Sequence, residues 1–301
     1  MSFEVMEAAK YPRRLWAAYG PAAVGKSRFA AQMRTPALIV DADGRFTEQL
    51  DFAAGTIYRM GKDHSLNVDP DAIARKLREE LPGSGVLTVV IDSLTAILRP
   101  IINEALADIE AGRAKNKVAA FKDKALAMSL LQDAVSVSGA DTLWIWHTHE
   151  SRDAGAKLVE KASIPEVELV RLRRSLNVIL RMDVEEDGRR SIKVDWARNG
   201  NSGIKLYDDT GSWIGMPEKL EEAIYSDGIK PETAPPIFSG PEEAIAWAFE
   251  QGCFRDAMHA KNAYEECKRD KAPKTAAAMA VVWKAEVDSR VKAQQAQKEA
   301  A

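Results

Sequence analysis

The sequence has few cysteines, no long apolar run and little net charge. It has only two cysteines, Cys253 and Cys267, which lie outside any CxxC pattern and are therefore interpreted as reduced thiols. We find no signal peptide and no long apolar span, which favours a cytoplasmic protein without a membrane partner. The formal net charge is only -3, so any contact with nucleic acid must come from a local basic patch.

What is present indicates a globular chain with more than one part. A length of 301 residues allows one large domain and a small second one. From residue 14 to about residue 150, short apolar runs alternate with helical patterns, which predicts βα units and a mainly parallel sheet. Two later runs, 176–184 and 189–197, are joined by the turn pair Asp187-Gly188, which predicts a hairpin. The expected fold class is α/β, with this hairpin as an antiparallel edge of the sheet.

The composition changes after Trp213. A stretch rich in proline and glycine is typical of a linker, and three helical patterns follow it. We therefore expect a core over residues 1–225, a linker over 226–240 and a small helical domain over 241–301. The last residues have no apolar face and are expected to fray.

The sequence "GPAAVGKS", residues 20–27, fits the pattern GxxxxGK[ST]. It follows a predicted strand and opens a predicted helix, which is the context that a phosphate-binding loop requires. Backbone N–H groups would surround the phosphates of ATP, Lys26 would neutralise phosphate oxygens, and the Ser27 hydroxyl would ligate Mg²⁺. The alternative is a glycine-bearing turn with a chance lysine. The residues expected to contact ATP are Gly20, Pro21, Ala22, Ala23, Val24, Gly25, Lys26, Ser27 and Arg28.

A second buried run, "VLTVVIDS", ends in Asp92. This position places a carboxylate at the carboxyl-terminal edge of the sheet, where ligands bind in such folds. Asp92 is therefore expected to contribute to nucleotide and Mg²⁺ binding, as the Walker-B aspartate does. The alternative is that Asp92 or Ser93 caps the next helix.

The run "ALIVDADGRF" narrows the class, because it resembles the RecA-type ATPase core. In that core, the strand after the phosphate-loop helix ends in an acidic residue that polarises the attacking water. The resemblance assigns this role to Asp43, although a glutamate is usual there; the alternative is an Asp43-Gly44 turn. The run "LWIWHTHES" lies where that family has its γ-phosphate sensor, with His147, Thr148 and His149 as candidates. A histidine that only caps a strand is the alternative, and no nearby cysteine or third histidine supports a metal site.

The segment "DWARNGNSG" is similar to a segment of hexameric replicative helicases with the same core. There an arginine reaches the ATP of the neighbouring subunit, which assigns that role to Arg198. The lysine expected two residues earlier is Trp196 here. A glycine-rich turn that only joins two strands is the alternative.

Two polar segments are candidates for contact with single-stranded DNA, because RecA-like proteins have a mobile DNA-binding loop at the position of the first. The alternative is an exposed loop with scattered charges. The candidate residues are Arg152, Lys157 and Lys161 in the first segment, and Arg113, Lys115 and Lys117 in the second.

Residues from about Tyr11 to Trp213 thus resemble phage-encoded AAA/RecA-like proteins of single-strand annealing and recombination. The resemblance implies a Mg²⁺-dependent ATPase that assembles as a ring or filament on single-stranded DNA in the bacterial host cytoplasm. A single-strand-binding or annealing protein would be a further partner. Three alternatives stay open: a helicase or helicase loader, an ATP-switched DNA-coating oligomer with little hydrolysis, and a small-molecule kinase.

Overall fold

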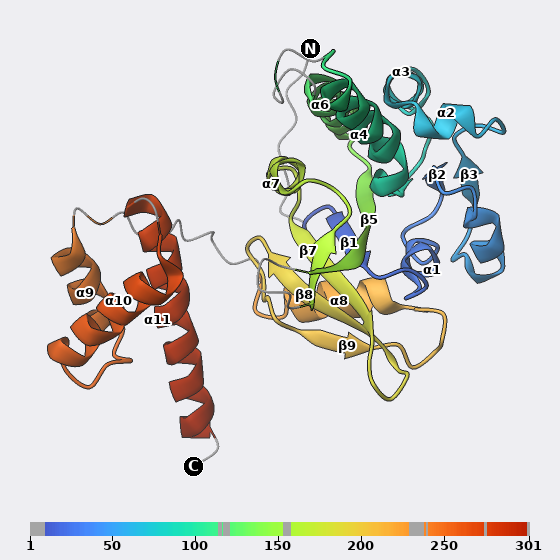
Figure 1. Ribbon diagram of the computed structural model, residues 1–301. Helices are drawn as coiled ribbons and strands as arrows, with labels where there is room; N and C mark the ends of the chain where they lie inside the picture. The colour runs from blue at the N-terminus through green and yellow to red at the C-terminus, as the bar shows by residue number, and fades with distance from the viewer. Residues whose placement is uncertain are drawn as a thin grey trace, which may run out of the picture. The chain divides into compact units, whose positions relative to one another are not determined.

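The computed structural model describes residues 10–113, 116, 121–152, 158–228, 238, 240–273 and 276–299. The chain divides into two compact units, Met1–Lys230 and Pro231–Ala301. Figure 1 shows a sheet with helices in the first unit and a group of helices in the second.

The first unit is organised around one mixed sheet. Six of its strands run parallel in the order β3-β2-β4-β5-β1-β7, and β8 and β9 continue the sheet antiparallel at one edge. Strand β6 pairs antiparallel with the extended end of β5. The α/β fold class and the antiparallel hairpin edge predicted from the sequence are confirmed. The strands are β1 Leu15–Gly20, β2 Ala37–Asp41, β3 Ile57–Arg59, β4 Thr88–Asp92, β5 Asp141–Arg152, β6 Leu158–Ala162, β7 Val178–Val184, β8 Arg190–Ala197 and β9 Lys205–Tyr207.

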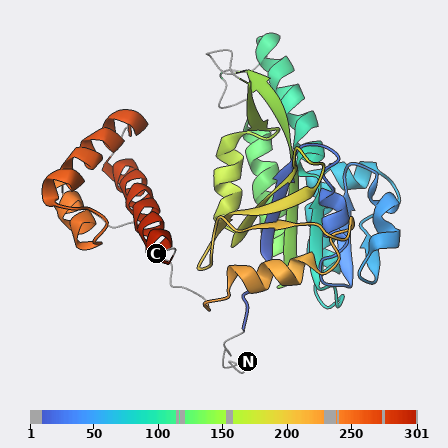
Figure 2. The ribbon, with the colours of Figure 1, turned by 90° about the horizontal axis from the view of Figure 1, so that it is seen from below.

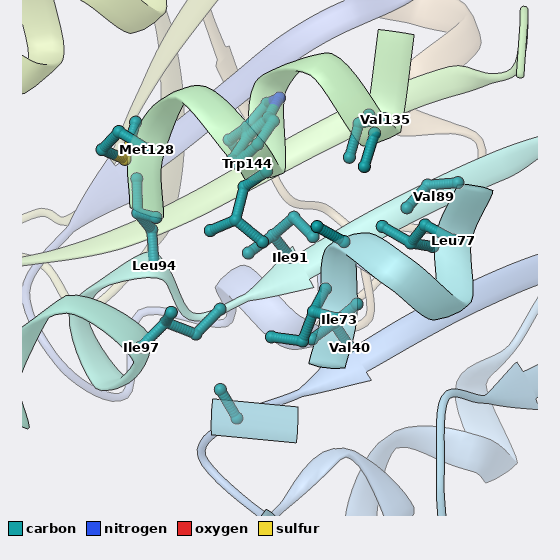
Figure 3. Close-up of a cluster of buried hydrophobic side chains, with 14 of the residues drawn as sticks. Val40, Ile73, Leu77, Val89, Ile91, Leu94, Ile97, Met128, Val135 and Trp144 are labelled. Carbon is teal, nitrogen blue, oxygen red and sulfur yellow. The ribbon is translucent and has the colours of Figure 1, made fainter. Parts of the chain in front are cut away.

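Helices cover both faces of this sheet (Figure 2). One apolar core joins the sheet to α3, α4, α6 and α7, and Figure 3 shows its centre around Ile91, Leu94 and Trp144. A second core on the other face joins the sheet to α1 and α8 through Phe29 and Leu220. The central strands are buried on both faces, which explains their nearly continuous apolar sequences. The helices are α1 Lys26–Ala30, the 3₁₀ helix η1 Phe46–Phe52, α2 Ser65–Val68, α3 Pro70–Glu80, α4 Leu94–Glu110, α6 Lys122–Ser136, α7 Glu166–Arg173 and α8 Met216–Ile224.

Helix α8 is an element that the sequence analysis missed. It begins after Gly215, which has a φ of 69°, and its residues Met216, Leu220 and Ile224 are buried at intervals of four. That spacing places all three on one face of a helix. The helix is short and adjoins the proline- and glycine-rich stretch, which hid its periodicity.

The second unit contains α9 Pro241–Glu250, α10 Ala257–Lys271 and α11 Ala276–Glu299. Trp283 is fully buried at its centre, where it packs against Phe254 and Tyr264 and donates from its indole nitrogen to the carbonyl of Ala244. Helix α11 continues to Glu299, into the segment whose end is expected to fray. In both units, none of the described helices has the length and apolarity needed to cross a bilayer.

Candidate functional site

The segment 20–27 forms a loop between β1 and α1, as the motif predicted. Two glycines in it occupy positions that no larger residue could share. A Cβ atom on Gly20 would overlap the carbonyl oxygen of Met182, and one on Gly25 would lie 2.7 Å from Nε1 of Trp213. Both glycines also have positive φ angles, 152° and 98°, which side chains disfavour. The loop can therefore keep this close-packed path only with glycine at both positions.

Lys26 is turned into this loop and is only 4% exposed. Its Nζ donates hydrogen bonds to the carbonyl oxygens of Gly20 at 2.9 Å and Pro21 at 2.5 Å. Burial lowers the pKa of Lys26 to about 8, although the nearby carboxylates of Asp92 and Asp43 favour the charged form. A buried ammonium bonded only to carbonyl oxygens is a strong attractor for an anion.

Asp92 ends β4 beside the loop and is 2% exposed. Burial raises the pKa of Asp92 to about 6, while a hydrogen bond with Ser27 favours its ionised form. Helix capping is done by the next residue, because Ser93 Oγ accepts from Ala96 N at the start of α4. The peptide bond between Asp92 and Ser93 is cis. The Asp92 carboxylate and the Ser27 hydroxyl thus form an oxygen pair that could hold Mg²⁺ together with phosphate oxygens.

Asp43 lies across the site, where Oδ2 is 3.2 Å from Nε2 of His147. Burial alone would raise its pKa, but hydrogen bonds with His147 and Ser93 outweigh this and lower the pKa of Asp43. The turn that follows β2 is held by Asp41 instead, which accepts from the backbone N–H groups of Arg45 and Phe46. Asp43 therefore keeps its carboxylate directed at His147.

The register of β5 separates the three candidates on that strand. The backbone N–H of His147 donates to Thr95 Oγ1 at 3.0 Å, which fixes its place beside the site. Thr148 instead hydrogen-bonds Glu160 on β6, and His149 bonds Ser163 at 3.1 Å. Only His147 of the three is brought to Asp43. A cavity of about 580 Å³ opens beside this pair.

Trp213 is a residue of the site that the sequence analysis overlooked. It is fully buried, adopts a φ of 61°, and packs edge-on against Phe29 of α1 at 6.2 Å. Its turn is held by Asp208, whose Oδ1 accepts from the backbone N–H of Trp213. The same turn is tied to the loop, since the Gly211 carbonyl accepts from Arg28 at 3.1 Å. The sequence "DDTGSW" is typical of a tight turn, but nothing in the sequence indicates that this turn contacts the glycine loop.

Arg198 lies at the opposite end of the strands from the glycine loop. Ala197 pairs with Val178, and Val178 pairs with Trp16 at the beginning of β1, whereas the loop follows its end. The Arg198 guanidinium donates to the Arg174 carbonyl at 3.3 Å and lies 5.7 Å from the Trp196 ring. Within one chain, the structure does not bring Arg198 to Lys26.

The first DNA-binding candidate segment is not the plain loop that was expected. Strand β5 runs on to Arg152, and β6 returns from Leu158, with Lys161 exposed on it. In the second segment, Arg113 is exposed and ion-paired with Asp108 at 2.7 Å. Lys115, Lys117 and Lys157 lie outside the described residues.

Residues 13–203 match the family model described as an AAA domain. The chain belongs to this family. The matched segment of the AAA domain contains the glycine loop, β1 to β8 and Arg198, but neither Trp213 nor α8. Together with the sheet order, the match shows an α/β P-loop NTPase fold followed by carboxyl-terminal helices. No curated protein matches this AAA-domain chain.

Three solved structures show a broad likeness to it at low identity. A RadB recombinase has a TM-score of 0.41 and 19% identity, covering 65% of this chain and 87% of RadB. A KaiC-like protein from Pyrococcus horikoshii OT3 has a TM-score of 0.39 and 15% identity, covering 65% and 86%. The flagellar accessory protein FlaH from Methanocaldococcus jannaschii has a TM-score of 0.39 and 14% identity, covering 65% and 85%.

Proposed function

We propose that this AAA-domain protein is a Mg²⁺-dependent ATPase of the RecA-like type that acts on single-stranded DNA as a homo-oligomer. The observation that carries the proposal is the position of Lys26. It is buried in a loop of backbone groups, beside the Ser27–Asp92 pair and opposite Asp43. Such an arrangement suits a polyphosphate better than any other common ligand.

In this proposal, the terminal phosphates of ATP replace the two carbonyl oxygens that now bind Lys26. The exchange is favourable because a charged acceptor bonds an ammonium more strongly than a neutral one. Ser27 and Asp92 would hold Mg²⁺, which neutralises charge on the phosphates. Burial of Asp92 strengthens its attraction for a divalent cation, since little water competes with it.

Asp43 is the residue that we assign to the attacking water. Its pKa is lowered, so it is ionised at neutral pH and can accept a hydrogen bond from water. The cavity beside Asp43 and His147 leaves room for that water. A residue that activates water must be held at one position relative to that water. The hydrogen bond with His147 holds the Asp43 carboxylate in this way.

Arg198 supports assembly because it cannot serve the site of its own chain. It lies at the opposite end of the strands from Lys26, so a contribution to hydrolysis requires a second copy. An arginine supplied by a neighbour stabilises the charge that develops on the transferred phosphoryl group. We therefore place the hydrolytic site between subunits, in a ring or filament.

DNA contact is assigned to the β5–β6 hairpin and to the segment after α4. The hairpin carries Arg152, Lys157 and Lys161, and the second segment carries Arg113, Lys115 and Lys117. Strand β5 also holds His147, so the hairpin is continuous with the nucleotide site. This continuity favours hydrolysis that depends on DNA.

The experiment that tests the proposal compares the wild type with Lys26→Ala in calorimetric titration with Mg²⁺-ATP, followed by phosphate release with and without oligothymidine. The wild type should bind ATP and release phosphate faster with DNA, whereas Lys26→Ala should lose ATP binding and keep its fold. Lys219→Ala is the control, because Lys219 is exposed on α8. Unchanged affinity in Lys26→Ala would contradict the nucleotide site, and a wild type that does not respond to DNA would contradict the DNA-dependent role.

A further inference from the structure

A second cavity, of about 830 Å³, lies between the β5–β6 hairpin, α7 and the sheet. Its volume falls in the range of sites that enclose small organic ligands. Residues from β1, β5, β6, α7, β7 and β8 line it, so it is built by the fold and not by one loop. None of the proposed ATP-contacting residues belongs to its wall.

An irregularity in β8 shapes this cavity. In the pairing with β7, Ile179 lies opposite Trp196 and Leu180 lies opposite Val194, so Asp195 is an extra residue. Such a bulge changes the direction of side chains, which here lets the consecutive residues Asp195 and Trp196 both line the cavity. Without the bulge, neighbouring residues of a strand would face opposite sides of the sheet.

Aromatic rings form much of the wall. Tyr19 and Trp146 stack in parallel with ring centroids 5.3 Å apart and an interplanar angle of 1°. Trp196 lines the cavity from β8, and the Arg173 guanidinium lies 4.5 Å from the centre of its ring. Flat rings and a guanidinium plane are the surfaces on which a planar heterocycle stacks.

The polar groups inside the cavity are already paired with one another. The Tyr19 hydroxyl donates to Asp195, and Arg181 forms an ion pair with Glu160 at 2.7 Å. The cavity lining carries three carboxylates, on Glu160, Glu166 and Asp195, and two guanidinium groups, on Arg173 and Arg181. It therefore offers both donors and acceptors, with one carboxylate in excess. Arg173 lines the cavity but is exposed, so its guanidinium can contact a phosphate outside the cavity.

We infer that this cavity binds a base of single-stranded nucleic acid, stacked against Trp196. The inference rests on the proposed function, and it adds a site separate from the basic residues of the two DNA-binding segments. An uncharged planar ring with hydrogen-bonding edges matches the aromatic wall and the paired polar groups, and Arg173 contacts the adjoining phosphate.

The location of the cavity also connects the base to ATP hydrolysis. Tyr19 directly precedes Gly20 of the phosphate loop, and Trp146 directly precedes His147. A base that presses on the stacked Tyr19–Trp146 pair therefore acts on two strands one residue before the nucleotide site. Binding of a base in this cavity would therefore affect ATP hydrolysis through β1 and β5.

The test measures binding of the full chain, with ATP present, to a fluorescein-labelled oligothymidine and to a strand of equal length whose bases are replaced by abasic sites. The wild type should bind oligothymidine more tightly than the abasic strand. Trp196→Ala should weaken oligothymidine binding about 5- to 150-fold, the range for loss of one stacked base. It should leave abasic binding nearly unchanged, so the preference for bases disappears. Trp196→Phe retains a stacking face and should retain the preference.

Tyr58→Ala is the matched control, since Tyr58 is an exposed aromatic residue on β3, at the other edge of the same sheet. It should bind both strands as the wild type does. Equal binding of both strands by the wild type would overturn the base site. So would an equal loss for both strands in Trp196→Ala, or a change in sedimentation of that variant without a change in DNA preference, which would assign the cavity to a subunit contact. A wild type that binds neither strand would instead contradict the DNA-binding role itself.

Discussion

The carboxylate of Asp43 lies 3.2 Å from the imidazole Nε2 of His147 and joins the end of β2 to β5. The other ring nitrogen, Nδ1, is buried and has no hydrogen-bond partner among the described residues. An ionised carboxylate only accepts hydrogen bonds, so this contact requires a proton on Nε2 of the imidazole. His147 is therefore a hydrogen-bond donor that orients Asp43, and its ring need not contact phosphate.

His147→Ala should lower kcat for ATP hydrolysis by about 10- to 100-fold, the effect typical of a group that orients a functional side chain. Its affinities for ATP and ADP should change by the same factor. His147→Gln should recover part of the activity, because its amide can donate to Asp43. His149→Ala, which alters a residue bonded to Ser163, should behave as the wild type. A selective loss of ATP over ADP affinity would show that His147 contacts the γ-phosphate instead.

ATP affinity should fall as the pH rises above about 8. Burial lowers the pKa of Lys26 to about 8, so the free protein loses the Lys26 charge in that range and binding must first restore a proton. Between about pH 7 and about pH 8 the lysine is mostly charged and Asp92, whose pKa is raised to about 6, is ionised, so the affinity should be nearly level there. The fall should not exceed about tenfold per pH unit for one proton. Titrations between about pH 7 and about pH 9.5 measure it, and a constant affinity over that interval would contradict the role of Lys26.

Arg198→Ala should lower turnover by about 10³-fold or more with little change in ATP affinity, as expected for an arginine supplied by a neighbour. Mixing it with Lys26→Ala should restore part of the phosphate release, because one subunit keeps the arginine and the other keeps the loop. Arg189→Ala is the control, since Arg189 is exposed in the β7–β8 turn, where it pairs with Asp187 and lies 4.5 Å from the centre of the ring of Tyr207. Failure of the mixture to recover activity would contradict the role of Arg198 as an arginine supplied by a neighbouring subunit.

Glu221→Ala should lower the free energy of unfolding of the first unit by about 3–5 kcal/mol. Glu221 is buried and pairs with Arg14 at 2.8 Å and with Arg34 at 3.0 Å, so its loss removes the main partner of the buried Arg14 charge. Glu218→Ala removes another carboxylate bonded to the same Arg14, but its side chain is 60% exposed. That control should cost less than about 1 kcal/mol. Urea denaturation followed by tryptophan fluorescence compares the two, and equal effects would contradict the importance of burial.

Local sequence predicted the elements whose structure depends on neighbours in the chain. The strand, glycine loop and helix around Lys26 follow from one motif, and Asp187-Gly188 placed the hairpin between β7 and β8. The sequence predicted a loop where β5 and β6 form a hairpin, because the segments 148–152 and 158–162 are largely polar and, among the described residues, pair only with each other. Helix α8 was missed because its buried apolar face is short, with only Met216, Pro217, Leu220 and Ile224, and is interrupted by the buried Glu221.

The α/β class, the phosphate loop and the carboxylate at the end of β4 could be predicted from the sequence, because each depends on spacing within a few consecutive residues. Which histidine meets Asp43 could not be predicted, since it depends on the register of β5 against its neighbours. The fold also places Trp213 behind Gly25. These residues are 188 positions apart in the chain (213 − 25), so no local pattern predicts their contact. Packing joins residues that are distant in the chain, and the burial of Trp213 against Phe29 specifies that contact through shape.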